Sequence, residues 1–192
     1  MRRSTDRILV THQGTLPQPE EIRALLRAKR SNEPFDAAAF AGLIRSNVTE
    51  GVRRQAAIGI DIPNDGEYSK TSFSDYVSDR LGGLQPTANP YVSPISGRDM
   101  KEYPEYFGGS TIPGVPRAAG IRRVIFECVE PLRYIGQAAL QTDLDNLKAA
   151  LHGTAVQEAY LPAVAPGSIE HWLKNGHYPN EEAFLYGIAD AM

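Results

Sequence analysis

The sequence has little cysteine and no long apolar run. Cys128 is the single cysteine among 192 residues, which excludes an intrachain disulfide and makes a reducing compartment the simplest location. No apolar run approaches the roughly 20 residues that a membrane span needs, and no signal-peptide core follows the start. We therefore expect a cytoplasmic protein that has no membrane partner.

Excess charge and nucleotide-binding motifs are lacking too. A formal net charge of −3 gives no electrostatic case for a nucleic-acid partner. Neither GxGxxG nor GxxxxGK[ST] occurs, so a Rossmann or P-loop protein has little support. A hydrophobic content of 42% with 22% charged residues is typical of a globular domain, and the length is sufficient for one sizeable core.

What is present is an alternation of short apolar strands with helices. Strands are predicted within residues 7–12, 60–67, 122–129 and 158–164, and helices within 20–30, 36–59, 74–81, 142–152, 169–173 and 180–192. Four strand-then-helix units predict an α/β fold with a parallel sheet, and polar strand ends without a phosphate loop favour a TIM-type barrel. A complete barrel needs about 250 residues. We therefore expect about four of eight (β/α) units, a half barrel, in a single domain over residues 1–192.

Residues 84–120 interrupt this alternation. Their prolines, glycines and tyrosines fit neither the helical nor the strand period. A loop longer than roughly 12–15 residues in a compact domain is usually a lid, a binding loop or disordered. The interleaved aromatic residues favour an ordered excursion from the domain, and disorder is the alternative.

The polar residues that suggest a site follow the first two predicted strands. His12 and Thr15 come after the first strand, and Asn64, Asp65 and Glu67 come after the second. The carboxyl ends of parallel strands meet at one edge of a sheet, where α/β proteins place ligand chemistry. The alternative is an ordinary polar loop in which Glu67 caps the helix that follows. We predict a binding site formed by these five residues.

Four segments together resemble the cobalamin-independent methionine synthase family in its single-barrel form. They are residues 11–19 (THQGTLPQP), 59–67 (GIDIPNDGE), 141–150 (QTDLDNLKAA) and 162–172 (PAVAPGSIEHW), and the resemblance spans nearly the whole chain. It implies a (β/α)₈ barrel that uses zinc to activate a substrate thiol, such as that of homocysteine. The thiol then receives a methyl or alkyl group, in the synthases from a folate-like donor.

The resemblance also implies roles for particular residues. In the synthases the segment matching GTLP usually reads Gly-Ser-Phe/Leu-Pro, and its hydroxyl contacts the amino-acid end of homocysteine together with the acid after the second strand. These two roles carry over to Thr15 and Glu67 as substrate-binding residues, with His12, Asn64 and Asp65 as their neighbours. No catalytic residue is assigned by the resemblance.

The chain departs from the family pattern at the metal. The family's zinc is held by a His-x-Cys pair, an acid and a further Cys from later strands, whereas this sequence has one cysteine and no His-x-Cys. A thiol-activating zinc needs several soft or imidazole ligands. Of the histidines, His152, His171 and His177 are predicted to be surface or capping residues. Cys128 is predicted to be a buried strand residue, with a reactive thiol as the alternative. We expect no metal ligand in this chain, and zinc only in the complete family barrel.

Three functions remain open. The leading hypothesis is the amino-terminal half of a methyl- or alkyltransferase that lacks the zinc-binding half and is inactive alone. The alternative is a non-catalytic half barrel that serves as an assembly or small-molecule-binding module. A metal-free decarboxylase of the uroporphyrinogen type would need arginines converging on the pocket, for which Arg98, Arg117 and Arg133 are the candidates.

The expected partners follow from the half-barrel prediction. Half a barrel leaves two unpaired strand edges and an inner apolar face with nothing opposite. We therefore expect a homo-oligomer or a complementary second-half polypeptide. The small-molecule partner would be a thiol or amino-acid substrate.

Overall fold

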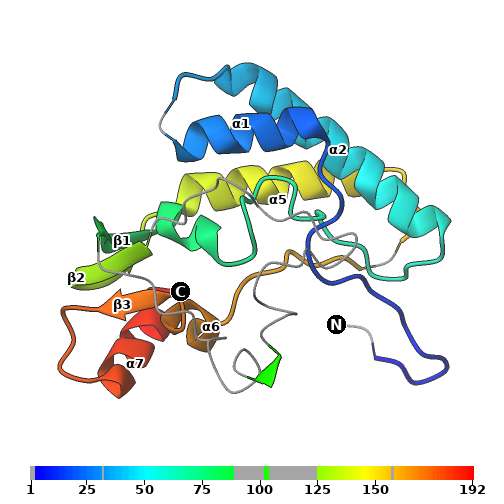
Figure 1. Ribbon diagram of the computed structural model, residues 1–192. Coiled ribbons are helices and arrows are strands. Elements are labelled where there is room, and N and C mark those ends of the chain that lie inside the picture. Colours follow the sequence, from blue (N-terminus) through cyan, green and yellow to red (C-terminus); the bar gives the residue numbers. More distant parts are fainter. Residues whose placement is uncertain (1–2, 32, 89–101, 104–124, 157) are drawn as a thin grey trace. The chain divides into compact units, whose positions relative to one another are not determined.

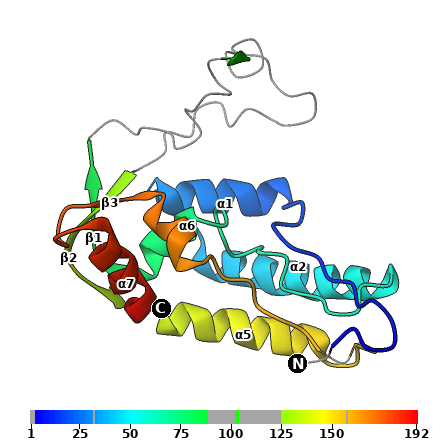
Figure 2. The same cartoon turned by 90° about the horizontal axis from the view of Figure 1, so that it is seen from below.

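The computed structural model describes residues 3–31, 33–88, 102–103, 125–156 and 158–192 (Figures 1 and 2). The chain divides into two compact units. The first unit comprises Met1–Leu81 and Tyr134–Ala165, and the second comprises Gly82–Arg133 and Pro166–Met192. The prediction of a single domain over residues 1–192 stays a prediction.

The first unit is built on three long helices. They are α1 (Glu20–Arg30), α2 (Ala37–Ala57) and α5 (Gln137–Leu151). A 3₁₀ helix, η1 (Asp75–Asp79), follows the polar stretch of residues 64–70. Helix α2 packs against both α1 and α5 (Figure 1). It begins where Asp36 accepts hydrogen bonds from two backbone N–H groups of the first turn, each at 2.9 Å, which is a typical N-cap.

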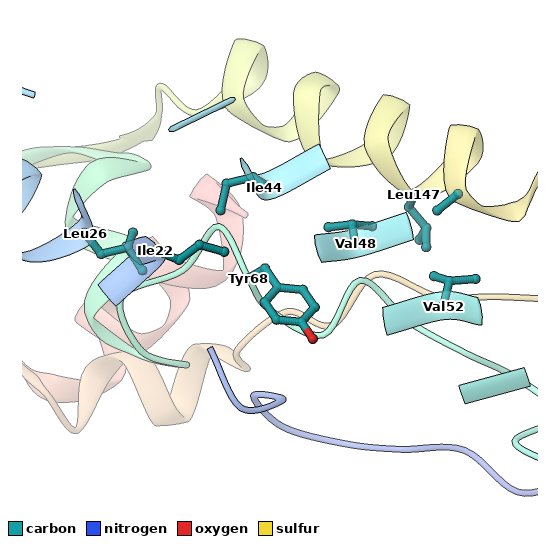
Figure 3. Packing of buried hydrophobic residues seen from close by; sticks show 8 residues of the cluster. Ile22, Leu26, Ile44, Val48, Val52, Tyr68 and Leu147 are labelled. Atoms are coloured by element: carbon teal, nitrogen blue, oxygen red, sulfur yellow. The ribbon is translucent and has the colours of Figure 1, made fainter. Parts of the chain in front are cut away.

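The core of the first unit lies between these helices. Its buried members come from α1 and α2, from α5, and from one residue of the polar stretch: Ile22, Leu26, Ile44, Val48, Val52, Tyr68, Leu147 and Ala150. Figure 3 shows the Tyr68 ring among these apolar side chains. A Cβ on Gly51 or on Gly66 would lie 2.9 Å from the Tyr68 ring, so the ring needs glycine at both positions. Tyr68 thereby anchors the polar stretch to the helices.

The second unit combines a small sheet with two helices. Its elements are β1 (Leu81–Thr87), β2 (Ile125–Tyr134), α6 (Pro166–Glu170), β3 (Leu173–Asn175) and α7 (Glu181–Ala191). Among the described residues the sheet has the order β1-β2-β3, and β2 pairs with β3 in parallel. The side chains of Cys128, Ile169, Phe184 and Ile188 are buried in this unit.

The predicted helices are largely confirmed. Helices were predicted at 20–30, 36–59 and 180–192, and the structure has α1, α2 and α7 there, with Asn180 capping the last. The start predicted at Thr142 is wrong, because α5 begins five residues earlier, at Gln137. The Thr142 hydroxyl donates to Ala138 O at 3.0 Å within the helix and caps nothing.

The predicted strands are confirmed only in part. Residues 7–12 and 60–67 form one parallel bridge, between Thr11 and Ile62, in place of two regular strands. Residues 158–164, all of them described, contain no strand. The third prediction is confirmed from Ile125 onward by β2, which continues past the expected end to Tyr134, while residues 122–124 lie outside the described residues. In the segment 84–120, β1 extends to Thr87, and residues 89–101 and 104–120 lie outside the described residues.

The α/β class with parallel pairing is confirmed, while the number of barrel units stays a prediction. Parallel pairing occurs at the Thr11–Ile62 bridge and between β2 and β3. Within the described ranges, every helix is too short or too polar to cross a membrane.

Candidate functional site

The two predicted strand ends of the first unit lie side by side. The Thr11 hydroxyl donates to Ile62 O at 2.6 Å, next to the parallel bridge between these residues. Residues 12–15 and 64–67 therefore continue from the same side of the bridge. The Leu16 N–H group donates to Gly66 O at 3.1 Å and holds the two segments together beyond it. The structure thus brings the predicted site residues into one region.

Thr15 and Glu67 form the central contact of this region. The Thr15 hydroxyl donates to Glu67 Oε2 at 2.6 Å, and Thr15 is exposed whereas Glu67 is buried. Glu67 is also the non-glycine residue with positive φ, at 56°, in the described part of the chain. Such backbone is unfavourable for a residue with a Cβ and is concentrated at functional sites. A buried acid in a strained turn, reached by an exposed hydroxyl, is a candidate for ligand binding.

Asn64 is fully buried and joins three segments of the first unit. Its Nδ2 donates to His12 O at 2.5 Å and to Tyr160 Oη at 3.2 Å, and its Oδ1 accepts from Gly66 N at 2.8 Å. The Tyr160 hydroxyl also donates to His12 O. These bonds shape the turn. A contact of Asn64 with substrate stays a prediction.

His12 is half-buried and is held by its neighbours. Its Nε2 lies 2.9 Å from Gly14 O, and because a carbonyl oxygen only accepts, this nitrogen carries the proton. The contact turns the imidazole back on its own loop, so His12 supports the segment that carries Thr15.

Asp65 is buried beside Glu67 in the same turn. Its Oδ1 accepts from Glu67 N at 3.1 Å. Burial raises the pKa of Asp65 to about 6, the positive charge of Lys70 opposes this rise, and the carboxylates of Asp143 and Glu67 add to it. Asp65 therefore changes its charge close to neutral pH.

Lys70 belongs to this region and was missed from the sequence. Its Nζ donates to Pro162 O at 2.5 Å, lies 4.0 Å from Glu67 Oε1, and lies 4.8 Å from the centroid of the Tyr76 ring. A lysine in a polar stretch is most often exposed, so composition alone did not indicate that this side chain is buried. The available clue was its spacing, three residues after the candidate acid.

Four further side chains of the site were also missed. Gln18 Nε2 donates to Lys70 O at 3.0 Å and so holds the backbone of the turn. Arg80 pairs with Asp143 at 2.8 Å, and both side chains are largely buried. Tyr160 reaches the site from a segment 96 residues beyond Asn64, a separation at which one sequence gives no pairing signal.

The donors for a zinc ion do not come together in the described part of this chain. Within the residues that the structure describes, no three His, Cys, Asp or Glu side chains are grouped so as to hold a metal ion. Cys128 is buried, as predicted, its Sγ donates to Glu130 O at 3.2 Å, and burial raises the pKa of its thiol. His152, His171 and His177 are exposed, as predicted. The donor set required by a thiol-activating zinc is therefore not met here.

Of the arginines proposed for a decarboxylase site, the structure describes only Arg133. Arg133 is exposed, and its guanidinium lies 3.7 Å from Glu130 Oε2. Arg98 and Arg117 lie outside the described residues. The structure thus gives this hypothesis no support.

A cavity of about 280 Å³ lies on the other side of the Thr11–Ile62 bridge. It is lined by Arg7, Leu9, Ala56, Gly59, Ile60, Asp61, Ile62, Ala155, Val156 and Glu158, and none of the five predicted site residues is among them. Its strand-segment residues precede the bridge or belong to it, whereas the candidate site follows it. In parallel α/β folds ligands bind beyond the carboxyl ends, so the cavity is the weaker candidate.

Parallel-bridged segments that present an acid and a hydroxyl beyond their carboxyl ends define an α/β protein with a candidate ligand site in the position usual for its class. The model of the family described as cobalamin-independent synthase, catalytic domain, matches residues 8–111, more than half of the chain. The chain belongs to this family, as the resemblance of its motifs predicted.

Curated relatives with matching segments are named 5-methyltetrahydropteroyltriglutamate–homocysteine methyltransferase. The protein of Aeromonas salmonicida is 32% identical over 88 residues, which are 46% of this chain and 12% of the relative. That of Nitratidesulfovibrio vulgaris is 30% identical over 101 residues, 53% of this chain and 13% of the relative. The chain therefore matches only about an eighth of the length of these relatives.

Solved structures of similar fold come from the same group of proteins. A B12-independent methionine synthase from Shewanella sp. W3-18-1, in complex with selenomethionine, has a TM-score of 0.61 and 15% identity, over 95% of this chain and 45% of that chain. A putative vitamin-B12 independent methionine synthase from Listeria monocytogenes has a TM-score of 0.59 and 15% identity, over 96% of this chain and 47% of that chain. At this identity the likeness shows the fold alone.

Proposed function

We propose that this chain binds the amino-acid end of a thiol substrate such as homocysteine, as the amino-terminal part of a methyl- or alkyltransferase barrel. The observation that carries the proposal is the Thr15–Glu67 contact at 2.6 Å, beyond the carboxyl ends of two parallel-bridged segments. Family membership and the homocysteine methyltransferase names of the relatives support the choice of substrate.

Each residue has a role that its surroundings allow. Glu67 accepts a charge-assisted hydrogen bond from the substrate ammonium group. The exposed Thr15 hydroxyl, which donates to Glu67 in the absence of ligand, turns to the substrate carboxylate while the ammonium takes its place on Glu67. Asp65, Asn64 and His12 form the surroundings of these two groups. Zinc and most of the chemistry belong to the other half of the barrel, so this chain alone transfers no methyl group.

Replacing Glu67 by Gln is expected to weaken the binding of L-methionine to the purified chain by at least tenfold. The amide keeps the shape of the side chain and removes the negative charge, and a charge-assisted bond contributes roughly 1.5–3 kcal/mol, against 1.4 kcal/mol for a factor of ten. Isothermal titration calorimetry at pH 7.5 measures the effect. L-methionine is the probe because it carries the amino-acid end and is not oxidised to a disulfide.

Glu50→Gln is the matched control for this measurement. Glu50 also accepts from positively charged side chains, Arg53 and Arg54, but it lies on α2 and is partly exposed. Its replacement should leave methionine binding unchanged. If the wild-type chain fails to bind methionine at millimolar concentration, or if both variants bind as it does, the proposed function is wrong.

The alternative of a non-catalytic module is favoured by the unmet zinc donor set in the described residues. Both hypotheses allow amino-acid binding, so a different experiment separates them. A second polypeptide carrying the remaining barrel segments of a family member, loaded with zinc, is mixed with this chain and assayed for methyl transfer to homocysteine. Activity that needs both polypeptides supports the transferase half. Stable association without any activity supports the assembly module.

We also propose that association covers the apolar side chains exposed near the bridged segments. Ile8 and Val10 on the first segment and Ile58 at the end of α2 are exposed, Ile8 by 81%. Light scattering of the purified chain should give at least twice the chain mass of 21.0 kDa. Ile8→Lys should shift the mass toward the monomer, and Thr49→Lys, at an exposed position of α2, should not. A monodisperse, folded monomer would rule out self-association.

A further inference from the structure

The turn that carries Glu67 holds three buried charged side chains. Asp65, Glu67 and Lys70 are exposed by 3%, 5% and 3%, respectively. Burying a charge is costly unless a partner of opposite sign lies close by. The two carboxylates and the one ammonium group of this turn therefore influence one another.

Lys70 lies closest to Glu67 but does not satisfy it fully. The distance of 4.0 Å between Lys70 Nζ and Glu67 Oε1 is an ion pair beyond hydrogen-bond range. The hydrogen bond of Lys70 goes to Pro162 O, and its other close neighbour is the uncharged ring of Tyr76. The Lys70 charge thus acts on the carboxylates through space while its own position is fixed from a different segment.

The charge of Asp143 on the adjoining helix α5 is balanced by Arg80, which follows η1. Asp143 of α5 is the other carboxylate that acts on Asp65, and it is paired with Arg80 at 2.8 Å. The net charge of the turn is therefore determined by Asp65, Glu67 and Lys70. When all three are ionised, the turn carries one negative charge in excess.

We infer that Asp65 and Lys70 set the charge of this turn at one negative unit near neutral pH, so that the site selects a ligand with a single ammonium group. The inference rests on the proposed function, in which Glu67 meets that ammonium. Asp65 and Lys70 act through Glu67 and touch no ligand themselves. They are positioning residues that determine specificity.

The raised pKa of Asp65 agrees with this assignment. Above about pH 6 Asp65 is ionised and the excess charge is present, and below it Asp65 takes up a proton and the turn becomes neutral. Binding of an ammonium ligand should therefore weaken as the pH falls through 6, together with the protonation of Asp65.

The decisive experiment compares two variants at pH 7.5. Asp65→Asn leaves Glu67 and Lys70 with no excess charge and should weaken methionine binding roughly tenfold. Adding Lys70→Met to Asp65→Asn restores one negative charge and should bring the affinity back to within about threefold of wild type. If the Lys70 side chain were needed only for structure, the double variant would instead bind more weakly than Asp65→Asn.

Analogues of methionine test the predicted ligand class. The amine that lacks the carboxylate, 3-(methylthio)propylamine, should bind and should respond to Asp65→Asn as methionine does. The acid that lacks the ammonium group, 4-(methylthio)butanoate, should not bind the wild-type chain. Lys29→Met is the matched control, because Lys29 pairs with Asp79 on the exposed surface, and it should change neither result.

A readout without ligand keeps this inference separable from the proposed function. The carboxyl titration of Asp65, followed by carbon-13 NMR, should move to higher pH by about one unit in Lys70→Met, because a nearby positive charge is lost. If methionine does not bind, the proposed function fails while this titration still tests the charge assignment. An unchanged titration, or a double variant that binds no better than Asp65→Asn, overturns the inference.

Discussion

Asp65→Asn is expected to raise the free energy of unfolding at pH 8 by up to about 3 kcal/mol. The pKa of Asp65 is raised from 3.8 to about 6 in the folded chain, chiefly by burial, and each unit corresponds to about 1.4 kcal/mol. Asparagine cannot ionise, and its Oδ1 can still accept from Glu67 N. The substitution therefore removes a destabilising charge and keeps the hydrogen bond.

The sign of the effect follows from the linkage between protons and folding. Because the folded chain holds the Asp65 proton more tightly than the unfolded chain, this group favours folding fully below pH 3.8. That contribution is lost as the pH rises through about 6. The difference between the variant and the wild type should therefore be small at pH 4 and reach its maximum above pH 6.

Urea unfolding at several values between pH 4 and pH 8 measures this difference. Glu50 and Asp61 have pKa values lowered to about 2 in the folded chain, so their protonation changes the stability below about pH 5. Their replacement by the corresponding amides should leave the slope between pH 5 and pH 7 unchanged. A variant whose advantage over the wild type is the same at pH 4 and at pH 8 would contradict the role of Asp65.

Asn64→Ala is expected to lower the free energy of unfolding by about 3 kcal/mol. Its side chain makes three hydrogen bonds in a fully buried position, with His12 O, Tyr160 Oη and Gly66 N. Each hydrogen bond contributes roughly 1 kcal/mol, and the buried Gly66 N–H would be left without its acceptor. Since domains unfold with only 5–15 kcal/mol, this loss is large. Denaturant unfolding at pH 7 measures it.

Asn47→Ala is the control for Asn64. The Asn47 side chain donates to Leu43 O at 2.8 Å within α2, and no second segment depends on it. Its loss should cost less than about 1 kcal/mol. Asn64→Asp is informative as well, because a carboxylate still accepts from Gly66 N but can no longer donate to His12 O. If Asn64→Ala and Asn47→Ala destabilise the chain equally, Asn64 does not join the segments of the site.

The two Asp65 effects run in opposite directions. The same substitution that should stabilise the fold above pH 6 should weaken methionine binding at pH 7.5. Such opposition is common where a site needs a buried charge that folding alone disfavours. It also distinguishes a functional acid from a structural one, because replacing a structural acid would lower the stability of the folded chain.

The helices could be predicted because their signals are local. Asp36 and Asn180 cap the helices that follow them, and the acidic residues Glu20 and Glu21 mark the first turn of α1. The start of α5 was missed because its N-cap is Gly136, which offers no side-chain hydrogen bond. The first polar residue with capping chemistry, Thr142, lies five residues into the helix.

The strands and half of the site depend on partners that one sequence does not reveal. Residues 158–164 have strand-like composition, but the structure uses them through single contacts, such as Tyr160 N to Pro63 O at 3.2 Å. The position of Thr15, Asp65 and Glu67 could be predicted, because polar residues after parallel segments meet. The burial of Lys70 could not, because it depends on Pro162, 92 residues away.

The left-handed backbone at Glu67 has a consequence for any attempt to stabilise this chain. Folding alone would choose glycine at this position, since glycine adopts a φ of 56° without steric cost. Sequence optimisation that scores only the folded backbone should therefore discard the acid that the proposed ligand requires. A redesigned chain that carries glycine at this position would unfold at a higher temperature but would bind the proposed ligand more weakly.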